Sequence, residues 1–195
     1  MSGDVITGRD GKLRCVWAGP GDTAMSRYHD EVWGTPTSDP SALFEALTLG
    51  VFEVGMSWKV VFGKRDGLRR AFKDFDAAKV ATMTDRDVDR LVDDASIIRS
   101  RAKIQATIDN ARAMISASPT LPELVESHSS HPRRAPLSLA DVPTSTAQAD
   151  AFAKQLKAQG YRFVGPTSVY AFMQNVGAVN DHIHGCFRAV DDRAE

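Results

Sequence analysis

The sequence predicts an all-α fold, because apolar residues recur at helical spacing and few segments alternate with the two-residue period of a strand. Helix start and stop signals support this class. Asp39 followed by Pro40 is typical of an N-cap and a first helical residue. Gly160 and Gly177 each follow a periodic segment, at the position where helices commonly end.

The first predicted helix begins at Pro40, and its apolar face is formed by Leu43, Phe44, Leu47, Val51 and Val54. Thr84 and Asp87 resemble a capping box and predict the start of another helix. The buried stripe of that helix is Val88, Leu91, Val92 and Ala95. The pattern breaks over residues 96–101 and resumes from Ile104 to Ile115.

Residues 117–145 lack periodicity and are rich in Pro, Ser and His, so we expect an irregular connection with one short helix near Leu121–Ser127. His128 and His131 are expected to be exposed residues of this connection. Two further helices are predicted over residues 146–159 and 167–176.

The length of 195 residues suits one domain or two closely packed lobes. We expect a flexible lead-in over residues 1–13, a single helical domain over 14–188 and a tail over 189–195. No apolar run approaches the roughly 20 residues of a membrane span, and no secretory signal is visible, which predicts a cytoplasmic protein with reduced thiols. We also expect a monomer. With a net charge of −1, any nucleic-acid binding must come from local basic patches.

Two cysteines and two histidines are the first chemical signal: Cys15, His29, His182 and Cys186. Two thiolates and two imidazoles satisfy tetrahedral Zn²⁺ with no open position, which is typical of a structural zinc. Such an ion would tie the two ends of the chain together. The spacing alone leaves open that the cysteines are unrelated buried thiols, or that His184 replaces His182.

The segment 91–104 predicts two helices joined by a tight turn, and free N–H groups at such a helix start can bind a phosphate. The residues expected beside the phosphate are Ile98, Arg99, Arg101 and Lys103. The alternative is an ordinary helical hairpin with a solvated basic turn. Ser96 and Ala102 stand where DNA-binding hairpins usually carry Gly.

Seven segments occur together along nearly the whole chain. They are RCVW at 14–17, YHDEVWG at 28–34, LFEAL at 43–47, GMSW at 55–58, DASIIRSRAKIQATIDNAR at 94–112, PTSTAQAD at 143–150 and GYRFVGPTSVYAFMQNVGAVNDH at 160–182. With Cys186, the chain resembles the 3-methyladenine DNA glycosylase I family. The resemblance implies the helix-hairpin-helix DNA glycosylase fold, with a zinc snap that joins the N- and C-terminal regions through Cys15, His29, His182 and Cys186.

The resemblance also implies a pocket for a base flipped out of double-stranded DNA. Its aromatic residues match Trp17, Tyr28 and Trp58, while Met25 stands where the family has a further tyrosine. Aromatic faces suit a cationic alkylated purine. Any one of these rings could instead pack the core, as we expect for Trp33.

Two neighbouring residues, Gly55 and Met56, match the pair that the family inserts into the gap left by the flipped base. The family's base-recognising glutamate matches Gly50, which is the main departure from the pattern. Glu53, one helical turn later, is a candidate for a relocated carboxylate. The alternative is a solvated residue at the rim of a pocket that has lost its recognition group.

We therefore expect a monofunctional base-excision glycosylase that releases 3-methyladenine or a related alkylated purine, with water as the nucleophile. Asp181 is expected to support a zinc ligand rather than act as a catalytic base. The alternative function is non-catalytic binding of damaged DNA. A third hypothesis is a pocket for a free purine or nucleoside.

Overall fold

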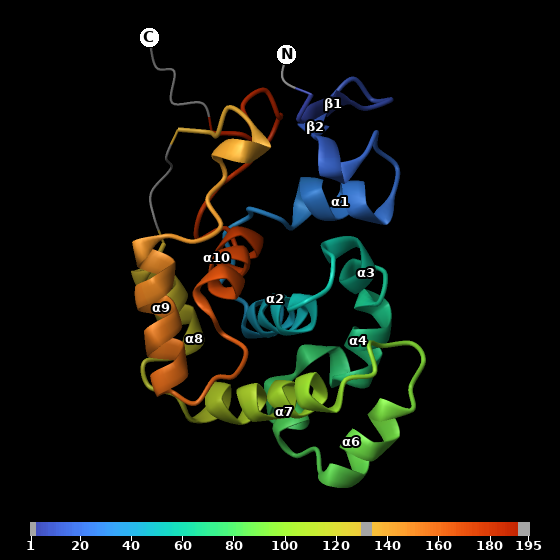
Figure 1. Ribbon diagram of the computed structural model, residues 1–195, viewed down its shortest axis with the longest axis vertical. Coiled ribbons are helices and arrows are strands. Elements are labelled where there is room, and N and C mark those ends of the chain that lie inside the picture. Colours follow the sequence, from blue (N-terminus) through green and yellow to red (C-terminus); the bar gives the residue numbers. More distant parts are fainter. Residues whose placement is uncertain (1–2, 130–133, 191–195) are drawn as a thin grey trace. The chain divides into compact units, whose positions relative to one another are not determined.

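The computed structural model describes residues 3–129 and 134–190, and these residues are mostly helical (Figure 1). The chain divides into two compact units. The first contains Met1–Thr37, Ser129–Thr144 and Met173–Glu195, and the second contains Ser38–His128 and Ser145–Phe172. His131 and residues 191–195 of the predicted tail lie outside the described residues.

The first unit begins with a two-stranded antiparallel ribbon of β1 (Val5–Thr7) and β2 (Leu13–Cys15), in which Val5 lies opposite Cys15. The ribbon falls largely within the expected lead-in. It was not predicted because three residues per strand are too few for alternation to be read. The unit continues with η1 (Val16–Ala18) and α1 (Ala24–Glu31), and it also contains η3 (Leu139–Asp141).

The second unit is helical throughout its described elements. They are α2 (Pro40–Glu53), α3 (Trp58–Phe62), α4 (Arg65–Ala71), η2 (Lys73–Phe75), α5 (Ala77–Ala81), α6 (Asp85–Val92), α7 (Arg101–Ser116), α8 (Leu121–Ser127), α9 (Ala147–Ala158) and α10 (Pro166–Asn175), of which residues 173–175 count with the first unit.

The start and stop signals at Asp39, Thr84 and Gly160 are confirmed, but Ala95, expected in a buried helical stripe, is exposed and lies beyond the end of α6. The Asp39 carboxylate accepts a hydrogen bond from the Ala42 amide at 2.8 Å and caps α2. Thr84 and Asp87 form the reciprocal bonds of a capping box at the start of α6. Gly160 follows α9 with φ 89°, a conformation that glycine adopts without strain.

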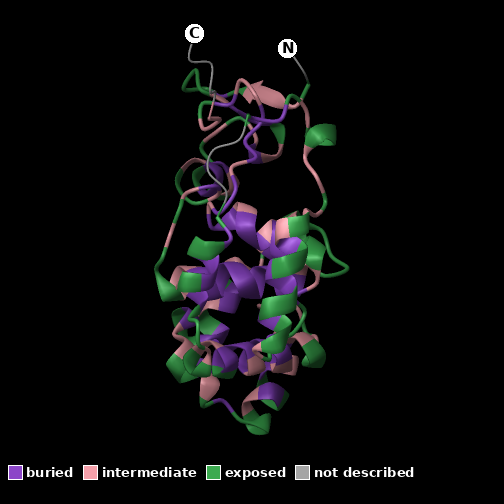
Figure 2. Ribbon diagram, turned by 90° about the vertical axis from the view of Figure 1, so that its left-hand side faces the viewer, coloured by how far each residue is buried: buried purple, intermediate pink, exposed green. Residues whose placement is uncertain are grey.

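Helix α2 is the core of the second unit, where it packs against α3, α5, α7 and α8. Every residue from Leu43 to Phe52 is buried, so the predicted single apolar face was too narrow. Val54 was expected on that face but is 42% exposed, because it caps the helix beyond its last turn. Figure 2 shows buried residues along the inward sides of the helices.

The expectation of an exposed His128 was wrong. This residue ends α8 and is only 9% exposed. Its ring stacks on Phe152 with centroids 4.5 Å apart, because α9 covers the end of α8. The described residues contain no helix long and apolar enough to cross a membrane.

Candidate functional site

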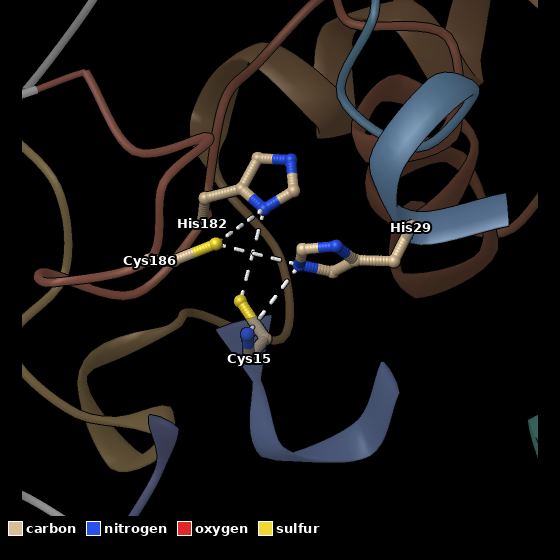
Figure 3. Close-up of side chains that lie close together, drawn as sticks. All are labelled: Cys15, His29, His182 and Cys186. Carbon is tan, nitrogen blue, oxygen red and sulfur yellow. Dashed lines mark hydrogen bonds between the residues drawn. The ribbon is translucent and has the colours of Figure 1, made fainter. Parts of the chain in front are cut away.

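Four buried ligand-type side chains meet in the first unit (Figure 3). Cys15 ends β2 and His29 lies in the last turn of α1, while His182 and Cys186 belong to the C-terminal segment. Their ligand atoms all lie within 4.8 Å of one another. The group therefore joins segments from both ends of the chain, and it contains His182 rather than His184.

The distances within this group suit a tetrahedral metal ion. The Cys186 Sγ lies 3.4 Å from His29 Nε2 and 3.6 Å from His182 Nδ1. The Cys15 Sγ lies 3.7 Å from His182 Nδ1. Zinc bonds of about 2.3 Å to sulfur and 2.1 Å to nitrogen, at tetrahedral angles, separate these atoms by about 3.6 Å. The donor set and its spacing therefore fit zinc.

Hydrogen bonds orient both imidazole rings. His29 Nδ1 lies 2.9 Å from Asp30 Oδ1, and His182 Nε2 lies 3.2 Å from the Trp33 carbonyl oxygen. Each outer nitrogen faces an acceptor and carries the proton, so the inner nitrogen directs its lone pair into the group. Gly34, with φ 71°, permits this approach because a Cβ there would lie 2.9 Å from His182 Nε2.

The two thiols perturb each other. The hydrogen bond from Cys15 lowers the pKa of Cys186, against the effect of burial and with further help from the two imidazoles. The same thiol–thiol bond and burial raise the pKa of Cys15. Backbone amides of Ile183 and Arg188 donate to the two sulfurs at 3.5 Å each. A bound cation would hold both sulfurs as thiolates.

Asp30 is a supporting residue that the sequence interpretation missed. Its carboxylate accepts bonds from Arg14 Nε at 2.9 Å and Arg14 Nη2 at 2.7 Å. Arg14 is 3% exposed and also pairs with Asp10 at 2.7 Å. Burial opposes ionisation of Asp30, but the bonds from Arg14 and His29 lower its pKa. The sequence signal that could have identified Asp30 is its position directly after His29. Asp181 accepts a bond from Gln174 at 2.9 Å, and its support of a zinc ligand stays a prediction.

Three predicted pocket residues lie in the first unit. The half-buried Trp17 meets His29 edge-on with centroids 5.1 Å apart. Tyr28 is 4% exposed and donates its hydroxyl to Asn175 Oδ1 at 3.1 Å. Met25 is half-buried on α1. Trp33 packs edge-on against His182 at 4.5 Å, in keeping with its expected packing role.

The other predicted pocket residues lie in the second unit. Gly50 is buried within α2, and a Cβ there would meet nothing closer than the Ser168 carbonyl oxygen at 3.8 Å. Glu53 ends α2, and burial raises its pKa. Among the described residues, its half-buried carboxylate has no hydrogen bond or ion pair. The half-buried Trp58 begins α3 beside Phe62. A single pocket built from both sets stays a prediction.

The predicted wedge follows α2. Gly55 has φ 74°, which favours glycine, and the Met56 side chain is 40% exposed. The predicted hairpin consists of α6, residues 93–100 and α7. Arg99 is exposed, and Ile98 packs against the core.

The other two basic residues that were expected beside the phosphate have protein partners. Arg101 is exposed and pairs with Asp89. Lys103 donates to the carbonyl oxygens of Phe52 and Val54. The structure therefore engages Lys103 in contacts that the sequence interpretation did not foresee.

The hairpin connection is held against α4. Lys64 donates to the Ala95 carbonyl oxygen at 2.8 Å. A Cβ on Gly67 would lie 2.2 Å from the Ser96 carbonyl oxygen, so only glycine permits this approach. Both contacts keep the backbone before α7 in place.

Comparison with known proteins identifies relatives over most of the chain. The family model for methyladenine glycosylase matches residues 17–189. A protein of Escherichia coli (strain K12) named DNA-3-methyladenine glycosylase 1 is 44% identical, covering 89% of this chain and 95% of its own. DNA-3-methyladenine glycosylase of Haemophilus influenzae is 37% identical, covering 89% and 96%.

Solved structures give the same result. A crystal structure of 3-methyladenine DNA glycosylase I has a TM-score of 0.84 at 42% identity, covering 91% of this chain and all of that one. The Staphylococcus aureus enzyme, solved to study 3-methyladenine recognition, has a TM-score of 0.82 at 30% identity, covering 90% and 96%. From its motifs, its fold and these matches, the chain belongs to the methyladenine glycosylase family.

Proposed function

We propose that this chain is a monofunctional DNA glycosylase that hydrolyses the N-glycosidic bond of 3-methyladenine, or of a related alkylated purine, in double-stranded DNA. The supporting observation is the 44% identity to an enzyme named for this activity, over 89% of the chain. A related structure was solved with 3-methyladenine bound, at 29% identity. Binding of damaged DNA without catalysis is not favoured, because the named relatives are glycosylases.

The chemistry needs little acid–base help from the protein. A 3-methylated adenine is cationic in DNA, so it leaves with the electron pair of the C1′–N bond as a neutral base. Water adds its oxygen to C1′ and releases a proton to solvent, which leaves an abasic site. The protein's tasks are to flip the nucleotide, stack the base and stabilise positive charge on the sugar.

We assign base stacking to Trp17, Tyr28 and Trp58, and we count Met25 among the residues that contact the base. We assign base recognition to Glu53, with Gly50 leaving room beside it. A partly buried carboxylate without a partner is costly, and the exocyclic amino group of a bound purine would supply the missing donor.

DNA binding is assigned to the second unit. The exposed Met56, next to Gly55, would fill the gap left by the flipped base. We propose that α6 and α7 act as a helix-hairpin-helix. A DNA phosphate would bind at the N-terminal end of α7, next to Ile98, Arg99 and Arg101. Ser100, the N-cap of α7, makes no side-chain bond to the first turn, so we propose that N–H groups there donate to the phosphate.

We propose that Cys15, His29, His182 and Cys186 hold one structural Zn²⁺. Four protein ligands leave no position for water or substrate, so the ion would supply folding energy and no reaction step. We also propose that residues 14–188 work as one glycosylase domain, in monomeric form, because the family match spans both units.

The test is base release from duplex DNA treated with a methylating agent, with enzyme in excess over lesions and free bases identified by chromatography. We expect 3-methyladenine in the product and heat-labile abasic sites in the DNA. A parallel assay measures binding to a duplex that carries an abasic-site analogue. Binding without release of any base, at every enzyme concentration, would contradict the proposed activity and support the non-catalytic alternative. Tight binding of a free purine that Met56→Ala and Arg99→Ala leave unchanged would favour the third hypothesis.

A further inference from the structure

Lys103 lies in the first turn of α7 and reaches across to the end of α2. Its Nζ donates to the Phe52 carbonyl oxygen at 2.9 Å and to the Val54 carbonyl oxygen at 2.6 Å. Carbonyls at the end of a helix have no partner within the helix. A cation in this position satisfies two of them and also suits the negative end of the helix dipole.

The turn that Lys103 holds carries Met56. The Met56 amide donates to the Glu53 carbonyl oxygen at 2.8 Å, and Gly55 between them has φ 74°. The carbonyls of three successive residues, 52–54, are therefore all engaged, two of them by Lys103. From this turn the Met56 side chain extends with 40% exposure, and α3 begins two residues later.

We propose that Lys103 is a positioning residue that ties the wedge turn, residues 52–56, to the start of α7, so that phosphate docking and Met56 insertion occur as one motion. This inference rests on the proposed function and deepens it. It replaces the direct phosphate contact expected of Lys103 from the sequence. Burial also lowers the pKa of Lys103, as expected for an ammonium partly withdrawn from water.

The position of Lys103 differs from that of its basic neighbour Arg99. Arg99 is exposed, whereas Lys103 is half-buried with two short bonds to protein carbonyls. A phosphate contact by Lys103 would compete with these bonds. An ammonium is compact and its donors diverge, which suits two separate carbonyls, whereas the planar fork of Arg suits two oxygens of one anion.

The experiment compares wild-type protein with Lys103→Met and Lys103→Arg. Lys154→Met, on an exposed residue of α9, controls for loss of one charge. Arg99→Ala is the reference for an exposed basic residue of the hairpin. Melting curves first establish that each variant is folded.

The first measurement is amide hydrogen exchange over residues 52–57 in the free protein. We expect exchange of the Met56 amide to accelerate at least tenfold in Lys103→Met and in Lys103→Arg, and to stay unchanged in Lys154→Met. Equal exchange in this turn in wild type, Lys103→Met, Lys103→Arg and Lys154→Met overturns the proposal. This measurement needs no DNA. It therefore tests whether Lys103 holds the wedge turn even if the wild-type protein releases no base and the proposed function fails.

The second measurement is single-turnover base release together with the salt dependence of binding to abasic-analogue DNA. We expect Lys103→Met to slow release at least tenfold and to keep the wild-type salt slope, with no rescue by Lys103→Arg. A direct phosphate contact would instead lower the slope by about 0.9 in Lys103→Met and be restored by Lys103→Arg. That result overturns the proposal.

Discussion

His29 Nδ1 and Asp30 Oδ1 lie 2.9 Å apart, and the same carboxylate is held by the buried Arg14. The pair fixes which nitrogen of His29 carries the proton and therefore which nitrogen faces the Cys₂His₂ group. Adjacent residues of one short motif thus provide one member of this group and the carboxylate that orients it.

Asp30→Asn removes the charge of this carboxylate while keeping its shape. We expect zinc affinity to fall roughly 10- to 100-fold, because the imidazole becomes less basic and less firmly oriented. Competition with a chelating indicator measures the affinity. Asp22→Asn is the matched control, since Asp22 is exposed in the same unit. Equal affinities in all three proteins would show that Asp30 has no role at the metal.

Cys186→Ser removes one ligand of the group. We expect loss of bound zinc and a free energy of unfolding lower by at least about 3 kcal/mol, or roughly 6–12 °C in melting temperature. Metal analysis and calorimetry measure the two quantities. Wild-type protein stripped by a chelator should melt near the variant, and the variant should not respond to the chelator. An unchanged melting temperature would rule out a structural role for the ion.

Glu53→Gln tests the proposed recognition of the base. A hydrogen bond to a charged group contributes about 1.5–3 kcal/mol, so we expect single-turnover base release to slow by roughly 10- to 100-fold. Glu126→Gln, on an exposed residue of α8, is the control. Wild-type rates in both variants would show that Glu53 does not recognise the base and is a solvated residue at the rim of the pocket.

The stability of the free protein should also depend on Glu53. Burial raises its pKa above the usual value of 4.5, so the folded state binds this proton more tightly than the unfolded state. The side chain therefore lowers stability as pH rises from about 4.5 through the folded-state pKa. We expect Glu53→Gln to melt higher than wild type at pH 7 and the difference to shrink toward pH 5. A constant difference across this range would contradict the assignment.

Two helical glycines should respond oppositely to alanine. A Cβ at Gly50 meets nothing closer than 3.8 Å, whereas one at Gly67 would lie 2.2 Å from the Ser96 carbonyl oxygen. We expect Gly50→Ala to stabilise the protein by about 0.5–1 kcal/mol and Gly67→Ala to destabilise it by about 1–3 kcal/mol. Denaturant unfolding measures both. The same sign for the two variants would contradict the packing described for α2 and α4.

Local sequence signals predicted much of the helical structure. The helix start and stop signals at Asp39, the Thr84–Asp87 box and Gly160 depend only on residues close by in the sequence. Helices begin or end at these positions in the structure. Strands β1 and β2 were not predicted, because their pairing joins residues 5 and 15, which do not belong to one local sequence pattern. The burial of His128 depends on α9, which begins 19 residues later.

The helical class, the family resemblance and the residue types that suit zinc could all be predicted from the sequence, because they follow from periodicity and from motifs along the chain. The choice of His182 over His184, the contact of Arg14 with Asp30 next to His29, and the bonds from Lys103 to the end of α2 become visible only in the folded chain. Those choices depend on distances between residues as far as 167 positions apart, which no local pattern encodes.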